Sequence, residues 1–261
     1  MMSKLEPTNN VRPAMPFRRL CAWIFVGLLA ATAITIRVAT MTTGVRLLLV
    51  GTLLFGLFTA LIYIIKLPGS HPKVLYPGLF FIALFVVWMV LANRQPNVPL
   101  LRSTYVKRLM KFDGTRYVRG GETTSGIDSS GLARSALWQA MLIEGVREFN
   151  PELMGKDFWK FWWRDLSVEA ILNGNYGYTK TIGKAAKLAG YDTSRLESGD
   201  MAVARNGIHI LIYLGKDRWI EANPNEKKVI INRAPANSKR AWFNVPVTFV
   251  RWKILQEPHN N

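Results

Sequence analysis

The sequence predicts a membrane anchor of three helices followed by an α+β domain. Three observations lead to this fold class. Residues 1–94 contain three long apolar runs. The residues that follow begin with helical spacing of apolar side chains and end in alternating patterns typical of strands. Helices first and strands afterwards favour helices packed on an antiparallel sheet over alternating βαβ units.

The apolar runs cover about residues 20–36, 47–65 and 74–92, with no charge inside any of them. Each is about as long as a helix that crosses a bilayer core, and basic residues such as Arg46 flank them. Buried helices of a soluble protein keep a polar stripe, which these runs lack. A cleavable signal peptide fits poorly, because two further apolar runs follow the first. Residues 1–94 are therefore a predicted anchor in a lipid bilayer, with short connections at 37–46 and 66–73.

The distribution of basic residues is consistent with two opposite orientations of this predicted anchor. The N-terminal tail carries Lys4, Arg12, Arg18 and Arg19, which favours a cytoplasmic N-terminus and, after three spans, a domain on the outer face. Basic residues between 94 and 111 follow the third span and argue for the opposite orientation.

Residues 95–102 contain two prolines and read as a linker, 103–255 as one domain and 256–261 as a polar tail. Within the domain, apolar spacing predicts helices at 103–112, 129–148, 156–172 and 181–188. Alternation predicts strands at 201–205, 208–214, 218–222, 228–232 and 245–252, with a hairpin between the second and the third.

The chain of 261 residues has a formal net charge of +17. The domain from residue 95 onward holds 25 Lys and Arg and 16 Asp and Glu, a net charge of +9. A basic domain surface suits nucleic acid, anionic lipid or an acidic polymer such as a bacterial cell wall. No nucleic-acid motif accompanies the charge, so a nucleic-acid partner is not expected. The only cysteine, Cys21, lies in the first apolar run, which leaves the domain without a disulfide or a thiol nucleophile. Gly120-Gly121 lacks the lysine and spacing of a phosphate-binding loop, and no metal or cofactor is expected.

The most informative segment is YVRGGETTSGIDSSG at 117–131. Two glycine turns lead to Asp128-Ser129-Ser130-Gly131, where a helical pattern begins. Free backbone N–H groups and the positive end of a helix dipole meet at such a point. The hydroxyl and carboxyl groups there suit either ordinary N-capping or a nucleophile.

His209 is the only histidine in a structured part of the predicted domain. It lies on a predicted strand, and the next strand can place Glu221 beside it. A carboxylate there would orient the ring, so Ser129, His209 and Glu221 have the makings of a nucleophile, base and orienting acid. A structural histidine is the simpler alternative for a lone strand residue.

The order of these motifs resembles the NlpC-type cell-wall peptidases. The resemblance covers about residues 103–224 and rests on Tyr-x-x-Gly-Gly, Ser-Gly-x-Asp-x-Ser-Gly, Gly-Asp and His-x-x-x-Tyr-Leu-Gly, in that order. It implies a papain-like fold and cleavage of amide bonds in peptidoglycan stem peptides.

The resemblance also implies roles for single residues. Ser129 stands where the family has its catalytic cysteine, His209 matches the general base, and Glu221 matches the polar residue that orients it. Tyr117 matches a tyrosine near the oxyanion. Asp128 and Ser130 flank the nucleophile, where they help to hold the substrate amine, and Gly199-Asp200 matches a structural turn.

The serine at position 129 leaves different functions open. The first is a peptidase or amidase of the bacterial inner membrane that acts on peptidoglycan peptides on the periplasmic face. The second is an inactive module that binds cell-wall fragments or a partner. The third, suggested by Trp159, Trp162 and Trp163, is a papain-like acyltransferase or lipid hydrolase.

Overall fold

The computed structural model describes residues 38–65, 95–205 and 207–257, with single residues and short stretches between 23 and 33 and between 76 and 87. Its centre is a six-stranded antiparallel sheet in the order β3-β8-β4-β5-β6-β7. The strands are β3 (Thr179–Ala185), β4 (Met201–Ala204), β5 (His209–Gly215), β6 (Arg218–Asn223), β7 (Lys228–Arg233) and β8 (Val247–Trp252). The five strands expected between 201 and 252 are confirmed, as is the hairpin of β5 and β6.

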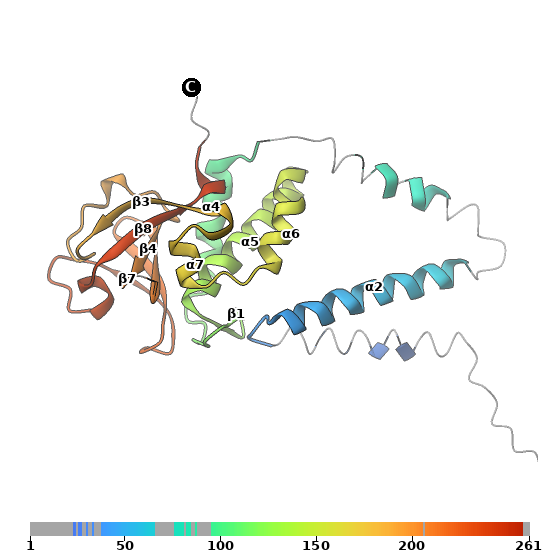
Figure 1. Ribbon diagram of the computed structural model, residues 1–261, viewed down its shortest axis with the longest axis horizontal. Helices are drawn as coiled ribbons and strands as arrows, with labels where there is room; N and C mark the ends of the chain where they lie inside the picture. The colour runs from blue at the N-terminus through green and yellow to red at the C-terminus, as the bar shows by residue number, and fades with distance from the viewer. Residues whose placement is uncertain are drawn as a thin grey trace, which may run out of the picture.

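Helices cover one face of this sheet (Figure 1). They are α4 (Val98–Met110), α5 (Ser129–Arg147), α6 (Lys156–Trp163) and α7 (Val168–Leu172). The apolar side of α5, including Leu132 and Ala136, packs in one buried cluster with Ile210 and Ile220 of the sheet. A helix at 129–148 was expected, and α5 confirms it. The arrangement is the predicted α+β architecture of helices on an antiparallel sheet.

The other face of the sheet is covered as well. Leu211 of β5 and Trp219 of β6 pack there against Phe243 from a short 3-10 helix, η4 (Ala241–Asn244), and against Phe249. Both faces of the central strands are therefore buried, and β5 is apolar at nearly every position as a result.

The helix expected at 181–188 is wrong, because Thr179–Ala185 forms the edge strand β3, paired with β8. Its alanines and lysines suit a helix, but Thr179, Thr181 and Ile182 are β-branched and suit a strand. Pairing with β8 overrides the local preference. Lys180 and Lys184 lie exposed along the free edge, where charge discourages pairing with another chain.

Two other boundaries also differ from the expectation. The predicted helix at 156–172 is two helices, because Arg164 is extended and Ser167 caps a new helix by accepting from Ala170 N at 3.2 Å. The predicted linker at 95–102 is mostly the first turn of α4. Asn97 caps that helix, and Pro99 lies in its first turn, where a missing N–H costs nothing.

The second apolar run of the predicted anchor coincides with helix α2 (Thr43–Ile65), whose side chains are described as far as Thr59. Among the described residues, no helix is both long enough and apolar enough to cross a membrane. The runs at 20–36 and 74–92 lie largely outside the described residues. Residues 38–46, called the strap below, precede or begin α2 and run against the domain beside strand β1 (Glu122–Thr123), as Figure 1 shows.

Gly199-Asp200 forms the turn before β4 that the sequence indicated. Asp200 is fully buried, and Arg251 holds its carboxylate by two hydrogen bonds, from Nε at 2.6 Å and from Nη2 at 2.7 Å. These bonds raise the pKa of Arg251. The pair joins the turn to β8.

Replacing Arg251 with methionine should leave the Asp200 carboxylate buried without its cation. We expect the free energy of unfolding to fall by about 3 kcal/mol, as for other broken buried pairs. Denaturant unfolding of the full chain, followed by tryptophan fluorescence, measures the change. The exposed Arg147→Met is the control, and equal stability of the two variants would contradict the expectation.

Candidate active site

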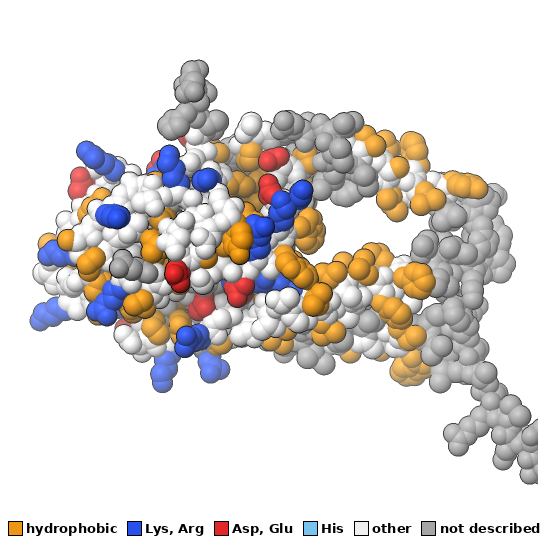
Figure 2. All heavy atoms as spheres, in the orientation of Figure 1, with side chains coloured by type: hydrophobic (Ala, Val, Ile, Leu, Met, Phe, Trp, Pro, Cys, Tyr) orange, Lys and Arg blue, Asp and Glu red, His pale blue; other side chains and the backbone are white. Residues whose placement is uncertain are grey.

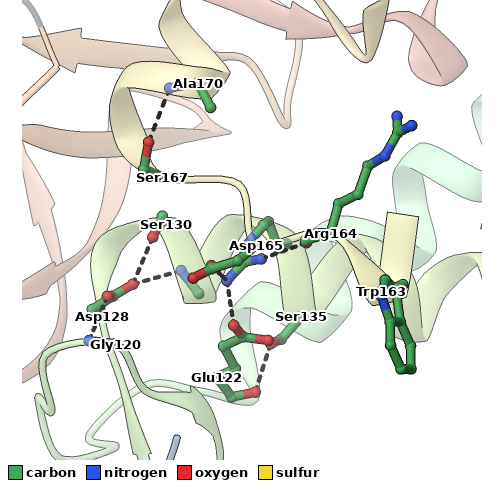
Figure 3. A network of polar contacts seen from close by, with 12 residues as sticks. Gly120, Glu122, Asp128, Ser130, Ser135, Trp163, Arg164, Asp165, Ser167 and Ala170 are labelled. Carbon is green, nitrogen blue, oxygen red and sulfur yellow. Dashed lines mark hydrogen bonds and ion pairs between the residues drawn. The ribbon is translucent and has the colours of Figure 1, made fainter. Parts of the chain in front are cut away.

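The segment before α5 is a short hairpin of β1 (Glu122–Thr123) and β2 (Gly126–Ile127). Asp128 follows it in an extended conformation and caps α5. Its Oδ1 accepts from Gly131 N at 2.7 Å and from Ser130 Oγ at 2.9 Å, while Oδ2 accepts from Gly120 N at 2.7 Å (Figure 3). Asp128 and Ser130 thus make the capping contacts that these residue types favour. Their expected contact with a substrate amine stays a prediction.

Ser129 is the first residue of α5 and is 6% exposed. The hairpin packs very closely here, because a Cβ on Gly131 would lie 2.0 Å from the carbonyl oxygen of Gly121. Only glycine fits at position 131. Ser129 Oγ makes no hydrogen bond within the described part of the chain. Its hydroxyl is therefore free at the positive end of a 19-residue helix.

His209 and Glu221 form a buried pair, as the hairpin pattern predicts. Nε2 of His209 lies 2.7 Å from Oε2 of Glu221, and the two residues are 3% and 1% exposed. The imidazole also stacks on Trp242, with ring centroids 4.5 Å apart and planes 24° apart. The guanidinium of Arg205 lies 5.7 Å from the centroid of the same indole.

Trp242 is a site residue that sequence reasoning missed. It lies in η4, which follows an irregular segment with no periodic pattern, so no sequence signal placed it near His209. Together Glu221 and Trp242 fix the edge and the face of the imidazole. With Nε2 engaged, Nδ1 is the ring nitrogen that has no hydrogen bond to a described residue.

Backbone contacts bring the loop before α5 to the same end of the sheet as this pair. Tyr117 bridges Ile127, and its N–H donates to Lys227 O at 2.8 Å. Lys227 lies in the turn between β6 and β7, just beyond Glu221. His209 begins β5, which runs antiparallel to β6, and therefore lies at this end too. Ser129 and Tyr117 therefore lie toward the same end of the sheet as His209 and Glu221, although no hydrogen bond among the described residues links Ser129 to His209.

Burial is the main factor that raises the pKa of Tyr117, and the nearby charge of Asp128 raises it further, while Arg119 opposes the shift. The phenol therefore keeps its proton to a higher pH than a free tyrosine and remains a hydrogen-bond donor. A donor of this kind could meet a developing oxyanion. The described residues contain no group of three or more side chains that could hold a metal ion.

A model of the NlpC/P60 family matches residues 114–245. Among solved structures, the NlpC/P60 domain of the peptidoglycan hydrolase SagA is 21% identical, with a TM-score of 0.36, 57% of this chain and 97% of that chain covered. The peptidoglycan hydrolase RipB from Mycobacterium tuberculosis is 19% identical, with a TM-score of 0.35 and coverages of 60% and 67%. The P60 domain of an antigen from M. avium subspecies paratuberculosis is 15% identical, with a TM-score of 0.37 and coverages of 62% and 100%. No curated protein matches the chain.

The capping contacts of Asp128 lead to a prediction about stability. Asp128→Ala removes the acceptor for Gly131, Ser130 and Gly120 and should lower the free energy of unfolding by about 1–2 kcal/mol. Asp128→Asn keeps one acceptor oxygen for Gly131 N but puts a donor NH2 group where Oδ2 accepts from Gly120 N, so it should recover only part of that loss. Thermal unfolding of the full chain compares the two variants. An asparagine variant as unstable as the alanine variant would show that the cap on Gly131 N contributes little to stability.

Proposed function

The chain belongs to the NlpC/P60 family, and from this premise we propose that it is a membrane-anchored peptidase or amidase that cleaves peptidoglycan stem peptides. The observation that carries the proposal is the buried pair of His209 and Glu221, 2.7 Å apart, at the end of the sheet where α5 begins with Ser129. We propose Ser129 as nucleophile, His209 as general base and Glu221 as the residue that orients His209.

The pair supports one tautomer of His209. A carboxylate at Nε2 favours the proton on that nitrogen, which leaves the lone pair on Nδ1 as the base. Ser129 Oγ attacks the amide carbonyl carbon while its proton passes to Nδ1. The imidazolium then gives this proton to the leaving amine as the C–N bond breaks. Water hydrolyses the acyl-serine ester in the second half of the reaction, with His209 again as base.

A serine demands more of the base than a cysteine does. A helix N-terminus beside a histidine stabilises a thiolate, but a hydroxyl is not ionised before attack. Its proton must leave during attack, so a charge that supports the imidazolium matters more. Glu221 supplies that charge from a buried position. The backbone N–H of Ser129 and the Tyr117 phenol are the proposed donors to the oxyanion.

We further propose that residues 1–94 anchor the chain in the bacterial inner membrane, with the domain on the periplasmic face. Side chains of α2 support the anchor: Leu47, Leu48, Leu53, Leu54, Leu57 and Phe58 are all more than half exposed. Figure 2 shows such hydrophobic side chains along the arms that leave the domain, while Lys and Arg gather over the domain itself. The substrate class supports the periplasmic face, since peptidoglycan lies there.

The second candidate function is a silent module that binds cell-wall fragments. Ser129 and His209 form no hydrogen bond with each other in the described part of the chain, and this favours the binding module. It would bind muropeptides without turnover. The third candidate, a lipid-directed enzyme, has less support, because Phe158 and Phe161 of α6 pack in the core and Trp162 lies against Trp138. Trp159 is 56% exposed and suits contact with a membrane surface.

The triad is tested by peptide release from purified sacculi with the full chain in detergent. Ser129→Ala should abolish release. His209→Ala should lower turnover by about 10²- to 10⁴-fold, the usual contribution of general acid–base catalysis. Glu221→Gln should lower it less, because glutamine keeps an acceptor but not the charge. Arg147→Met is the matched control. Tight muropeptide binding by a wild-type chain that releases nothing would establish the silent module instead.

The role of Tyr117 gives a separate prediction. Tyr117→Phe removes one proposed oxyanion donor and should lower kcat by about 10²-fold, with a small change in KM. Because the pKa of Tyr117 is raised, the ratio of the wild-type and variant rates should stay constant from pH 7 to about pH 9. Initial rates across that pH range measure both effects. A ratio that falls towards one below pH 9 would contradict the assignment.

A further inference from the structure

Arg46 flanks the second apolar run, and in the structure it is a buried residue of the strap. It is 1% exposed. Its Nη1 donates to Trp163 O at 2.6 Å, and its Nη2 donates to both carboxylate oxygens of Glu122, at 3.0 and 2.8 Å. An arginine from the predicted anchor thus inserts between α6 and the hairpin β1–β2.

The strap backbone also pairs with the hairpin. Thr40 bridges Gly121 in antiparallel fashion, and the N–H of Glu122 donates to Ala39 O at 2.8 Å. The hydroxyl of Thr123 donates to Val38 O at 3.3 Å. Residues 38–40 therefore lie alongside β1, held by one isolated bridge and two hydrogen bonds.

Glu122 connects the strap to α5, the helix that begins with Ser129, because it contacts residues of both. Arg134 of α5 shares the carboxylate of Glu122, and Ser135 Oγ donates to the Glu122 carbonyl oxygen at 2.6 Å (Figure 3). Arg134 also bonds Arg164 O and Asp165 Oδ1, both at 3.0 Å. Asp165 is largely exposed, so Glu122, which is 14% exposed, is the more buried of the two carboxylates and lies between Arg46 and Arg134.

The residue before Glu122 completes the link to the candidate nucleophile. Gly121, which pairs with Thr40, accepts from Asp128 N at 3.0 Å through its carbonyl oxygen. The same carbonyl packs against Gly131. Through Gly121 the strap is therefore two contacts away from Asp128 and Gly131, which lie within two residues of Ser129.

We propose that the strap positions the nucleophile, with Arg46 as the positioning residue that acts through Glu122. The domain then depends for its active geometry on a segment between two predicted membrane helices. The catalytic part of this inference rests on the proposed function, whereas the docking of the strap does not. Misplacement of a reacting group by about 1 Å can cost about 10²-fold in rate, so a small shift of the hairpin matters.

The test uses the full chain in detergent, with Arg46→Met, Arg46→Lys and the exposed control Arg147→Met. For Arg46→Met we expect amide hydrogen exchange of residues 117–131 to rise at least tenfold, with exchange of the sheet unchanged. We expect kcat to fall at least tenfold while KM stays within twofold. Arg46→Lys keeps the charge but not the bidentate contact with Glu122, so its exchange rate and kcat should lie between those of wild type and Arg46→Met. If Arg46→Met does not fold, Arg46→Lys takes its place in the test.

A disulfide provides the rescue. Val38→Cys with Thr123→Cys, in a Cys21→Ser background, should lock the strap onto the hairpin when oxidised. In the Arg46→Met chain, oxidation should restore slow exchange and kcat, and reduction should remove both. The single-cysteine variants are the controls.

Three results would overturn the inference. Exchange and kcat within twofold of wild type in Arg46→Met would remove any positioning role. Faster amide exchange throughout the sheet, with no rescue by the disulfide, would show that Arg46 stabilises the whole domain and does not specifically position Ser129. A disulfide that does not form would exclude the docked strap. If the wild-type chain releases no peptide, the proposed function fails. Amide exchange and cross-linking alone then test whether the strap docks on the hairpin and orders it.

Discussion

The close approach of the Gly121 carbonyl to the first turn of α5 is the constraint on which the candidate site depends. The absence of a side chain at Gly131 permits it, and Asp128 secures it from both sides by capping α5 and holding Gly120. These contacts set where the helix starts and so where the Ser129 hydroxyl lies. The hairpin, Tyr117 and the strap all attach to this point, while His209 and Glu221 come from the sheet that α5 packs against.

The candidate site has one side chain held in place by its neighbours, His209, and one without a hydrogen-bond partner in the described part of the chain, Ser129. On the sheet, the imidazole of His209 is fixed at its edge by Glu221 and across its face by Trp242. On the helix, the Ser129 hydroxyl has no hydrogen-bond partner within the described residues. A hydrolase needs these two side chains to meet at a substrate carbonyl, and catalytic hydrogen bonds often tighten only when substrate is bound. A rigid base and a free hydroxyl are compatible with such a site and with a groove that only binds.

Sequence patterns predicted most of the sheet, α5, and the pairing of His209 with Glu221, because two alternating segments joined by the short turn Gly215-Lys216-Asp217 indicate a hairpin. They failed where tertiary contacts outweigh local preference. Residues 179–185 became an edge strand because β8 offers a partner. Two interactions left no local pattern: Trp242 reaches His209 from an irregular segment, and Arg46 reaches Glu122 across 76 positions. The sequence placed Arg46 only as a basic residue flanking an apolar run, and its contact with Glu122 became visible only in the structure.

If residues 1–94 form the proposed membrane anchor, the docked strap restricts how the chain can cross the bilayer. Residues 38–46 touch the domain, so both must occupy the same compartment. The intervening chain must then traverse the membrane an even number of times. The apolar runs at 47–65 and 74–92 either both traverse it or both remain on one side, and a topology with one traversal between them is ruled out. If the run at 20–36 also traverses, the N-terminal tail and the domain face opposite compartments.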